Sequence, residues 1–218
     1  MSTEHSPGEA LDPDLALLAA IADGDGHAFE RLVGRHQDRL VAVCERLLGN
    51  REDARDAAQD VFLKVYRGAA SFRPQGRVST WLYRVAVNHC LNRMRRRKIA
   101  QFLSFGALGG DEPDAPEFDP PTDAPDPRQV LESRQRWQVT RKTIDALPTN
   151  QRAVLVLAKF EGLAYKEIAE VLGITMGAVE SRLFRAMRRL EQAQEATFGR
   201  VQEADDRTAQ EAPGPRVQ

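Results

Sequence analysis

The chain has 218 residues, of which 42% are hydrophobic and 29% are charged, a composition typical of a soluble globular protein with room for two small domains. No apolar run approaches the ~20 residues of a membrane span, and the first residues are polar and acidic, so we expect neither membrane insertion nor a signal peptide. Two cysteines, Cys44 and Cys90, are too few for a disulfide framework and indicate a cytoplasmic protein.

The net charge of −1 conceals a separation of charge along the chain. Residues 61–110 contain ten Lys and Arg residues and no Asp or Glu, whereas residues 111–127 contain seven acids and no base. Because local charge decides whether a polyanion is attracted, the near-neutral total is compatible with a nucleic-acid partner.

The first packed unit is expected over residues 12–99. Apolar residues recur at three- and four-residue steps from Phe29 to Leu48 and predict a helix, which the following Gly49 should end. A second helix is expected over residues 52–68. No segment of the unit alternates apolar and polar residues, so the sequence predicts helices alone.

A third long helix is predicted for STWLYRVAVNHCLNRMRRRK, residues 79–98. At 100° per residue, one face is apolar and the opposite face is polar and basic. The apolar face contains Tyr83, Ala86, Val87, Cys90 and Met94, and the polar face contains Trp81, Arg84, Asn88, Asn92 and Arg95. Single-stranded nucleic acid is bound by aromatic side chains, which stack on the nucleobases, and by basic side chains between them, which contact the phosphates.

Two other interpretations of this helix are open. A core helix with a basic end in solvent would have the same composition. A metal site is disfavoured, because the adjacent His89 and Cys90 diverge by about 100° around a helix and their spacing does not match a zinc motif.

Residues 100–127 are predicted to be a flexible linker. Within them, residues 111–127 contain six prolines and seven acids, and lack the apolar content for a packed core. Residues 1–11 and 194–218 are polar, and we expect both to be disordered.

The second packed unit is expected over residues 128–193, where Leu147-Pro148 should separate two helices. LAYKEIAEVLGITMGAVESRLFRAMRRL, residues 163–190, has the pattern of a helix-turn-helix. Gly173 permits the turn, Thr175 is a good N-cap, and the second helix has a basic outer side. The apolar inner positions are Ile168, Ala169, Leu172, Ile174, Val179, Leu183, Met187 and Leu190. An ordinary helical hairpin is the alternative.

The two units together resemble a known family. DAAQDVFLKVYRGAASF (residues 56–72) followed by STWLYRVAVNHCLNRMRRR resembles region two of an extracytoplasmic-function (ECF) sigma factor of bacterial RNA polymerase. ALPTNQRAVLVLAKFEGLAYKEIAEVLGITMGAVESRLFRAMRRL (residues 146–190) resembles region four, and the TWLYR run is similar to the sigma-E-like branch. The resemblance implies an all-α protein with two small helical domains joined by a flexible acidic, proline-rich linker.

The resemblance also implies which residues of region two bind. The surface for the β′ clamp helices of core polymerase corresponds to Asp56, Gln59, Asp60, Phe62 and Lys64, with Arg39 as a weaker candidate. The promoter −10 element, with one base flipped into a pocket, corresponds to Phe72, Arg73, Trp81, Tyr83, Arg84, Asn88, Asn92 and Arg95. The helical periodicity instead places Tyr83 on the buried face.

For the −35 element, the resemblance points to the second helix of the helix-turn-helix. The corresponding residues are Gly177, Ala178, Glu180, Ser181, Arg182, Phe184, Arg185 and Arg188. Glu180 departs from the Lys or Arg common in the family; its carboxylate repels phosphate but can accept a hydrogen bond from cytosine N4. Asn92 replaces a frequent Asp and can both donate and accept.

The implied function is that of a sigma factor, which binds core RNA polymerase through its β′ clamp helices and β subunit and directs promoter-specific initiation. The expected partners are core polymerase, promoter DNA and an anti-sigma factor, with no cofactor and no metal. The alternative is a helix-turn-helix regulator that binds operators without polymerase. An enzyme is disfavoured, since the four histidines have no ligand spacing and no Gly-rich phosphate loop is present. A pure interaction scaffold would leave both basic faces unexplained.

Overall fold

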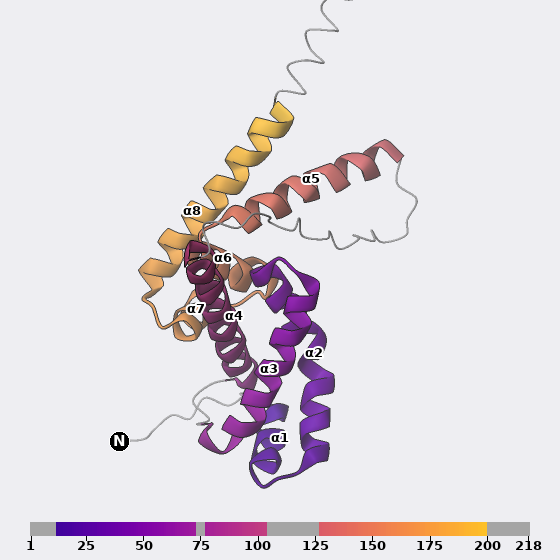
Figure 1. The fold of residues 1–218 in the computed structure, drawn as a ribbon, viewed down its shortest axis with the longest axis vertical. Helices are drawn as coiled ribbons and strands as arrows, with labels where there is room; N and C mark the ends of the chain where they lie inside the picture. Colours follow the sequence, from indigo (N-terminus) through magenta and orange to yellow (C-terminus); the bar gives the residue numbers. More distant parts are fainter. Residues whose placement is uncertain (1–11, 73–76, 104–126, 200–218) are drawn as a thin grey trace, which may run out of the picture.

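The computed structural model describes residues 12–72, 77–103 and 127–199, and every regular element within them is a helix, as the sequence predicts (Figure 1). The first domain contains α1 (Pro13–Ala22), α2 (Gly26–Leu48), α3 (Arg51–Gly68), the 3₁₀ turn η1 (Ala69–Ser71) and α4 (Val78–Leu103). The second contains α5 (Pro127–Ala146), α6 (Thr149–Leu155), the π turn η2 (Val156–Phe160), α7 (Tyr165–Leu172), α8 (Met176–Gln194) and the π turn η3 (Glu195–Gly199).

The long helix α2 forms the spine of the first domain. Its predicted apolar stripe is buried, with Leu32, Val43 and Leu47 fully enclosed. The Asp25 side chain caps its start by accepting from the backbone N–H groups of His27 and Ala28. Gly49 ends it with φ of 76°, a left-handed conformation that glycine adopts without strain, so the predicted helix end is confirmed.

Helix α4 lies against α2 and α3 through the face that the sequence predicts. Tyr83, Ala86, Val87 and Cys90 are at most 3% exposed. The Cys90 thiol lies beside that of Cys44, and this hydrogen-bonded neighbour together with burial raises the pKa of Cys90. The Cys90 thiol therefore remains protonated, and both cysteines serve as small core residues.

A single carboxylate, that of Asp12, caps two helices. Its Oδ1 accepts from the backbone N–H of Asp14 in α1 at 3.0 Å, and its Oδ2 accepts from the backbone N–H of Val78, the first residue of α4, at 2.7 Å. Asp14 in turn is bound by Arg35 at 2.7 Å and lies 2.6 Å from His36, both of α2. Helix α1 thereby fixes where α4 begins.

Two helices extend beyond the domain limits expected from the sequence. Helix α4 continues to Leu103, and α8 continues to Gln194 and then into η3. Contacts with α5 hold the second extension, because the Gln194 Nε2 donates to Thr140 Oγ1 at 3.1 Å and the Arg136 guanidinium covers the Phe198 ring at 5.4 Å. The remainder of the expected linker and of both expected disordered ends lies outside the described residues.

The two domains lie against each other, with α4 of the first packed beside α7 of the second (Figure 1). The predicted breaks in the second domain are present: Leu147-Pro148 separates α5 from α6, and Gly173, with a positive φ angle, ends α7. Among the helices of the described residues, none has an apolar stretch long enough to cross a membrane.

We predict that Asp12→Ala destabilises the protein by about 1 kcal/mol or more, because it removes one cap from α1 and another from α4. The change in free energy of unfolding is measured by urea denaturation. Hydrogen exchange supplies the specific signature, since exchange should quicken in the first turn of α4 as well as in α1.

The matched control is Asp25→Ala, which removes a cap from α2 alone. If Asp12→Ala leaves exchange at the start of α4 no faster than Asp25→Ala does, the shared cap does not position α4.

Candidate nucleic-acid and protein interfaces

The polar face of α4 is exposed along its length. Arg84, Asn88, Asn92 and Arg95 all lie at the surface, one helical turn apart. Trp81, one turn earlier, is half-buried. These five side chains, which we call the α4 stripe, occupy the single face that the helical periodicity predicts.

An aromatic pair lies at the N-terminal end of the α4 stripe. The rings of Phe72 and Trp81 are tilted by 60° with centroids 5.1 Å apart. Phe72 stands at the edge of residues 73–76, so the candidate Arg73 lies outside the described residues. Two adjacent rings at the surface can supply the stacking platform that an unpaired base requires.

Some basic side chains of α4 lie outside the α4 stripe. Arg93 and Arg97 turn toward Asp53 of α3, with Arg97 at 3.5 Å. These pairs hold α3 against α4, so the positive charge of the α4 stripe comes from Arg84 and Arg95.

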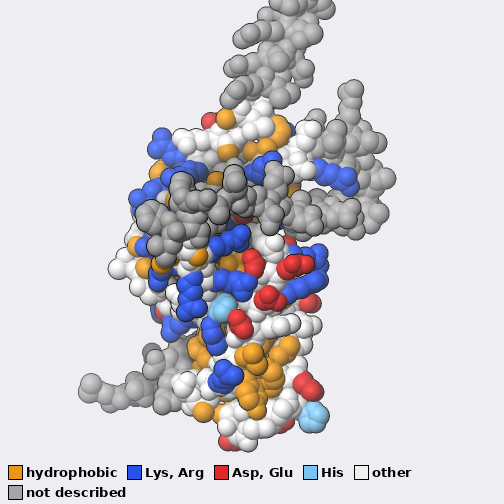
Figure 2. Space-filling view, in the orientation of Figure 1, with side chains coloured by type: hydrophobic (Ala, Val, Ile, Leu, Met, Phe, Trp, Pro, Cys, Tyr) orange, Lys and Arg blue, Asp and Glu red, His pale blue; other side chains and the backbone are white. Residues whose placement is uncertain are grey.

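The residues of α3 that the resemblance assigns to polymerase lie on two sides of that helix, one toward α4 and one toward α2. Asp56, Gln59, Asp60 and Lys64 are exposed. Phe62 is buried, at 7% exposure, and lines a groove between α2 and α3 together with Gln59. Figure 2 shows hydrophobic side chains gathered over α3 in the lower part of the molecule.

Two of these residues also meet His89 of α4. The Lys64 Nζ donates to His89 Nδ1, and the Asp60 Oδ2 lies 3.5 Å from His89 Nε2. Burial, followed by the charge of Lys64, lowers the pKa of His89, so the imidazole is neutral at pH 7. Its neutral Nδ1 can then accept the lysine proton, which orders this part of the α3 surface.

Helix α8 of the second domain presents the other candidate surface. Thr175 caps the helix by accepting from the backbone N–H of Ala178 at 3.2 Å, as predicted. Val179 and Leu183 are buried, so the intervening residues turn outward. The outward residues are Gly177, Glu180, Ser181, Phe184, Arg185 and Arg188, while Ala178 and Arg182 are half-buried.

Two features prepare this surface for a polar ligand. The Arg185 guanidinium is held by Ser181, donating to its backbone oxygen at 3.1 Å and its hydroxyl at 2.8 Å. Phe184 beside it is 67% exposed. A basic helix with its first turns exposed matches the geometry of a major-groove reader.

The inner face of the helix-turn-helix differs slightly from the prediction. Ile168 and Val171 are buried, whereas Ala169 and Leu172 are half-buried. The short helix α7 turns Val171 inward because it also packs against α4, a contact that periodicity within α7 cannot reveal.

The sequence analysis missed a buried carboxylate between the domains. The Glu161 side chain is only 2% exposed. It accepts hydrogen bonds from Arg39 Nε at 2.9 Å, from Arg46 Nη1 at 3.2 Å and from Tyr83 Oη at 2.8 Å. All three donors belong to the first domain, so one side chain of the second domain gathers three groups of the first.

The environment of Glu161 changes the acidity of its neighbours. Burial and the hydrogen bond to Glu161 raise the pKa of Tyr83, so its hydroxyl remains a donor. The hydrogen bond to Glu161 also raises the pKa of Arg39. Tyr83 is thus buried, as periodicity predicts, and its hydroxyl is hydrogen-bonded to Glu161.

A second charged side chain crosses the domain boundary. Arg152 is 6% exposed and donates to the backbone oxygen of Leu47 at 2.8 Å and to that of Asp145. Burial lowers the pKa of Arg152. A cation at the carbonyl end of α2 is favoured by the helix dipole. Arg84 of the α4 stripe completes the boundary by donating to the Glu170 backbone oxygen at 2.9 Å.

A signal for these residues exists in the sequence. RAVLVLAKFE, residues 152–161, places one charge at each end of a run dominated by apolar residues. Charged residues beside such a run are candidates for buried, paired groups. The sequence could not reveal their partners in the first domain, which lie more than 100 residues away.

We predict that the free energy of unfolding of the wild type falls relative to that of Tyr83→Phe above about pH 10. The tyrosine pKa is raised in the folded state, so its contribution is complete below the unfolded pKa of about 10 and is lost as pH rises. The expected slope is about 1.4 kcal/mol per pH unit, measured by urea denaturation.

Tyr66→Phe is the matched control, since Tyr66 is 43% exposed. Parallel pH profiles for the wild type and Tyr83→Phe would show that the Tyr83 hydroxyl is not held as described.

Comparisons with known proteins agree with the two-domain arrangement. The family model described as sigma-70 region 2 matches residues 32–99, and that of sigma-70 region 4 matches residues 138–190. The ECF RNA polymerase sigma factor SigM of Mycobacterium tuberculosis is 37% identical, with 81% of this chain and 82% of that protein covered. The ECF RNA polymerase sigma-E factor of Haemophilus influenzae is 34% identical, with 82% and 93% covered.

Solved structures share the fold. CnrH, solved in complex with the cytosolic domain of CnrY, has a TM-score of 0.59 and 26% identity, covering 84% of this chain and 97% of that one. The sigma factor RpoE of Bartonella quintana, solved with the anti-sigma factor NepR, has a TM-score of 0.62 and 23% identity, covering 77% and 96%. The second likeness bears on the fold alone.

Proposed function

The chain belongs to the ECF sigma factors of RNA polymerase, and from that premise we propose how its surfaces direct promoter-specific transcription initiation. It binds core polymerase, reads the −35 element as duplex and reads the −10 element as separated strands. The observation that carries the proposal is the presence of two exposed reading faces, the α4 stripe and the outer side of α8, on one chain.

The α4 stripe is the proposed −10 surface. Phe72 and Trp81 offer stacking, and Asn88 and Asn92 offer amides that donate to and accept from base edges. Removing a base from its stack costs a few kcal/mol, and stacking on an aromatic ring returns about 1–3 kcal/mol per base. The surface therefore favours strands that are already separated. We extend it to Arg73, Tyr83, Arg84 and Arg95.

The outer side of α8 is the proposed −35 surface. Arg182, Arg185 and Arg188 can donate hydrogen bonds to phosphates and to guanine edges. The Ser181 hydroxyl can bond either to the DNA backbone or to a base edge. Glu180 is exposed among them and would accept from cytosine N4. Gly177, Ala178 and Phe184 complete this surface at the start and middle of the helix.

The exposed side of α3 is the proposed dock for the β′ clamp helices of core polymerase. Asp56, Gln59, Asp60 and Lys64 supply its polar groups, and the groove at Phe62 lies next to Gln59. The polymerase β subunit is a further proposed contact.

An anti-sigma factor is a further proposed partner. CnrH was solved with a bound protein domain, and in this chain the groove between α2 and α3 is open to a second protein. We also propose that the chain acts in the cytoplasm, where polymerase works, and that it contributes binding rather than a catalytic step of its own.

We predict that purified chain added to core polymerase supports transcription from its promoter, and that Asn88→Ala and Arg182→Ala each reduce this about tenfold or more. Loss of one base or phosphate contact of this kind costs about 1–3 kcal/mol. Run-off transcription from a pool of promoter fragments measures the effect. Asn88→Ala should act on strand opening and Arg182→Ala on duplex binding.

Lys159→Ala is the matched control, because it removes an exposed basic side chain of the second domain that is not part of α8. Duplex binding without any binding to core polymerase would favour the operator-binding regulator instead. Equal losses in Arg182→Ala and Lys159→Ala would contradict the role of α8.

A further inference from the structure

We propose that Glu161 is a latch that holds the second domain against the first in the free chain, and that this closed arrangement restrains its use as an initiation factor until polymerase and DNA separate the domains. The inference rests on the proposed function for its consequence and on the domain boundary for its mechanism. No other chain is required for closure, because both sides of the contact belong to one molecule.

The chemistry of Glu161 explains why the contact is specific. A carboxylate withdrawn from water is strongly destabilised unless charged donors replace the lost hydration. Here two guanidinium groups and one hydroxyl surround it, and the first domain supplies all three. Without the first domain, Glu161 would lose these partners and return to water, so the closed state is defined by this cluster.

The contact occupies groups that the proposed function needs elsewhere. Arg39 is committed to Glu161 by its Nε and by a second bond from Nη2 to the Glu161 backbone oxygen at 3.2 Å. Tyr83 is committed through its hydroxyl, and Arg84 of the α4 stripe through Glu170. Polymerase and −10 DNA must therefore compete with the second domain for these side chains.

The closed arrangement is also too short for a promoter. Helix α4 packs on α7 and α7 packs on α8, and packed helices lie about 8–10 Å apart, so α4 and α8 are separated by at most about 20 Å. The −35 and −10 elements are about 25 base pairs apart by their names, or about 85 Å of B-DNA. For α4 to bind the −10 element while α8 binds the −35 element, the two domains must therefore separate.

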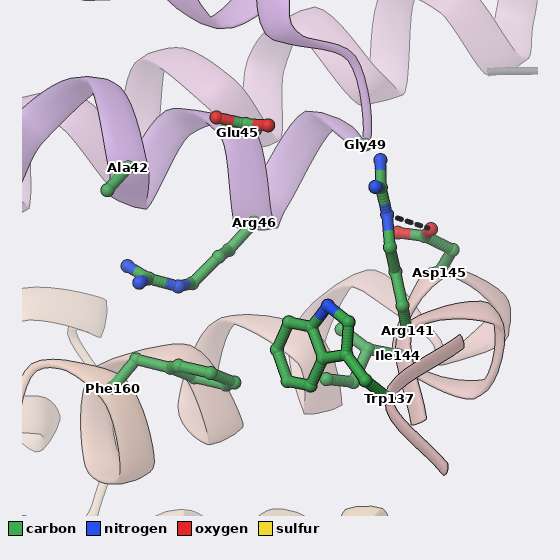
Figure 3. Close-up of a pocket in the computed structure, with 9 residues that line it drawn as sticks. All are labelled: Ala42, Glu45, Arg46, Gly49, Trp137, Arg141, Ile144, Asp145 and Phe160. Atoms are coloured by element: carbon green, nitrogen blue, oxygen red, sulfur yellow. Dashed lines mark ion pairs between the residues drawn. The ribbon is translucent and has the colours of Figure 1, made fainter. Parts of the chain in front are cut away.

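Packing at the boundary leaves a gap beside Glu161, although buried apolar residues of both domains belong to one continuous cluster. A cavity of 190 Å³ remains where α2 faces α5 and η2 (Figure 3). Ala42 and Arg46 line one side and Trp137, Ile144 and Phe160 the other. Arg46 reaches across this gap, with its guanidinium 4.7 Å from the centre of the Phe160 ring. Apolar packing is thus incomplete beside the latch.

We predict that Glu161→Gln and Arg46→Gln each raise the ratio of open to closed chain about tenfold or more, as expected for losing a charge-assisted hydrogen bond. The measurement is energy transfer between dyes on Cys introduced at the exposed positions Arg31 and Gln192 of the full chain. The native Cys44 and Cys90 are fully buried and should not label. The double variant should open less than the two single effects combined, because the two residues form one contact.

Glu191→Gln is the matched control, since it removes one exposed carboxylate from the same domain. Equal energy transfer in Glu161→Gln, Arg46→Gln and Glu191→Gln overturns the latch. Arg46→Gln keeps the test valid if Glu161→Gln fails to fold. This measurement uses neither polymerase nor DNA, so it stands whether or not the proposed function does.

The inhibitory consequence has its own readout. If binding to core polymerase requires the open chain, Glu161→Gln should lower the apparent Kd for core polymerase about tenfold, in proportion to the gain in open chain. Greater opening without any gain in affinity would overturn the restraint. The Glu191→Gln control should leave both energy transfer and affinity at their wild-type values.

Discussion

The buried carboxylate of Glu161 is the interaction on which the arrangement of the whole chain depends. Buried apolar residues of the two domains form one cluster, and paired charges across the boundary fix how the domains meet: Glu161 with Arg39 and Arg46, and Arg152 with the carbonyl end of α2. Such pairs add little net stability, because desolvation offsets most of the attraction, but they are specific in geometry. Paired charges of this kind allow the two domains to meet in one orientation. The domains separate when a partner binds the same side chains more favourably.

The reading surfaces depend on a simpler constraint. In α4 and α8, one helical side must be buried, and the remaining residues are forced outward in a regular row. The shared Asp12 cap fixes the start of α4, and Thr175 fixes the start of α8, so each row begins at a defined point. Side chains held on rigid helices can then meet bases at fixed spacing, which suits recognition of promoter sequence.

Local pattern was sufficient to predict the helices, their ends at Gly49 and Gly173, and the exposed α4 stripe, because periodicity and capping are properties of neighbouring residues. The resemblance and the periodicity disagreed at Tyr83, and the side chain is buried. The contacts between the domains could not be predicted, because periodicity indicates which side of a helix is buried but not which element packs against it. Glu161 and Arg39 are 122 residues apart, and nothing local pairs them. The assigned binding residues remain predictions.

The most direct test of the account is a footprint of the complete complex on promoter DNA. Hydroxyl-radical protection reports duplex contacts, and permanganate reports unpaired thymines, in one sample of core polymerase with or without the chain. We predict that the chain produces protection at the −35 element and reactive bases at the −10 element together, about 25 base pairs apart by their names, or about 85 Å of duplex. Protection of a duplex site with no unpaired bases, or with no need for core polymerase, would contradict the account.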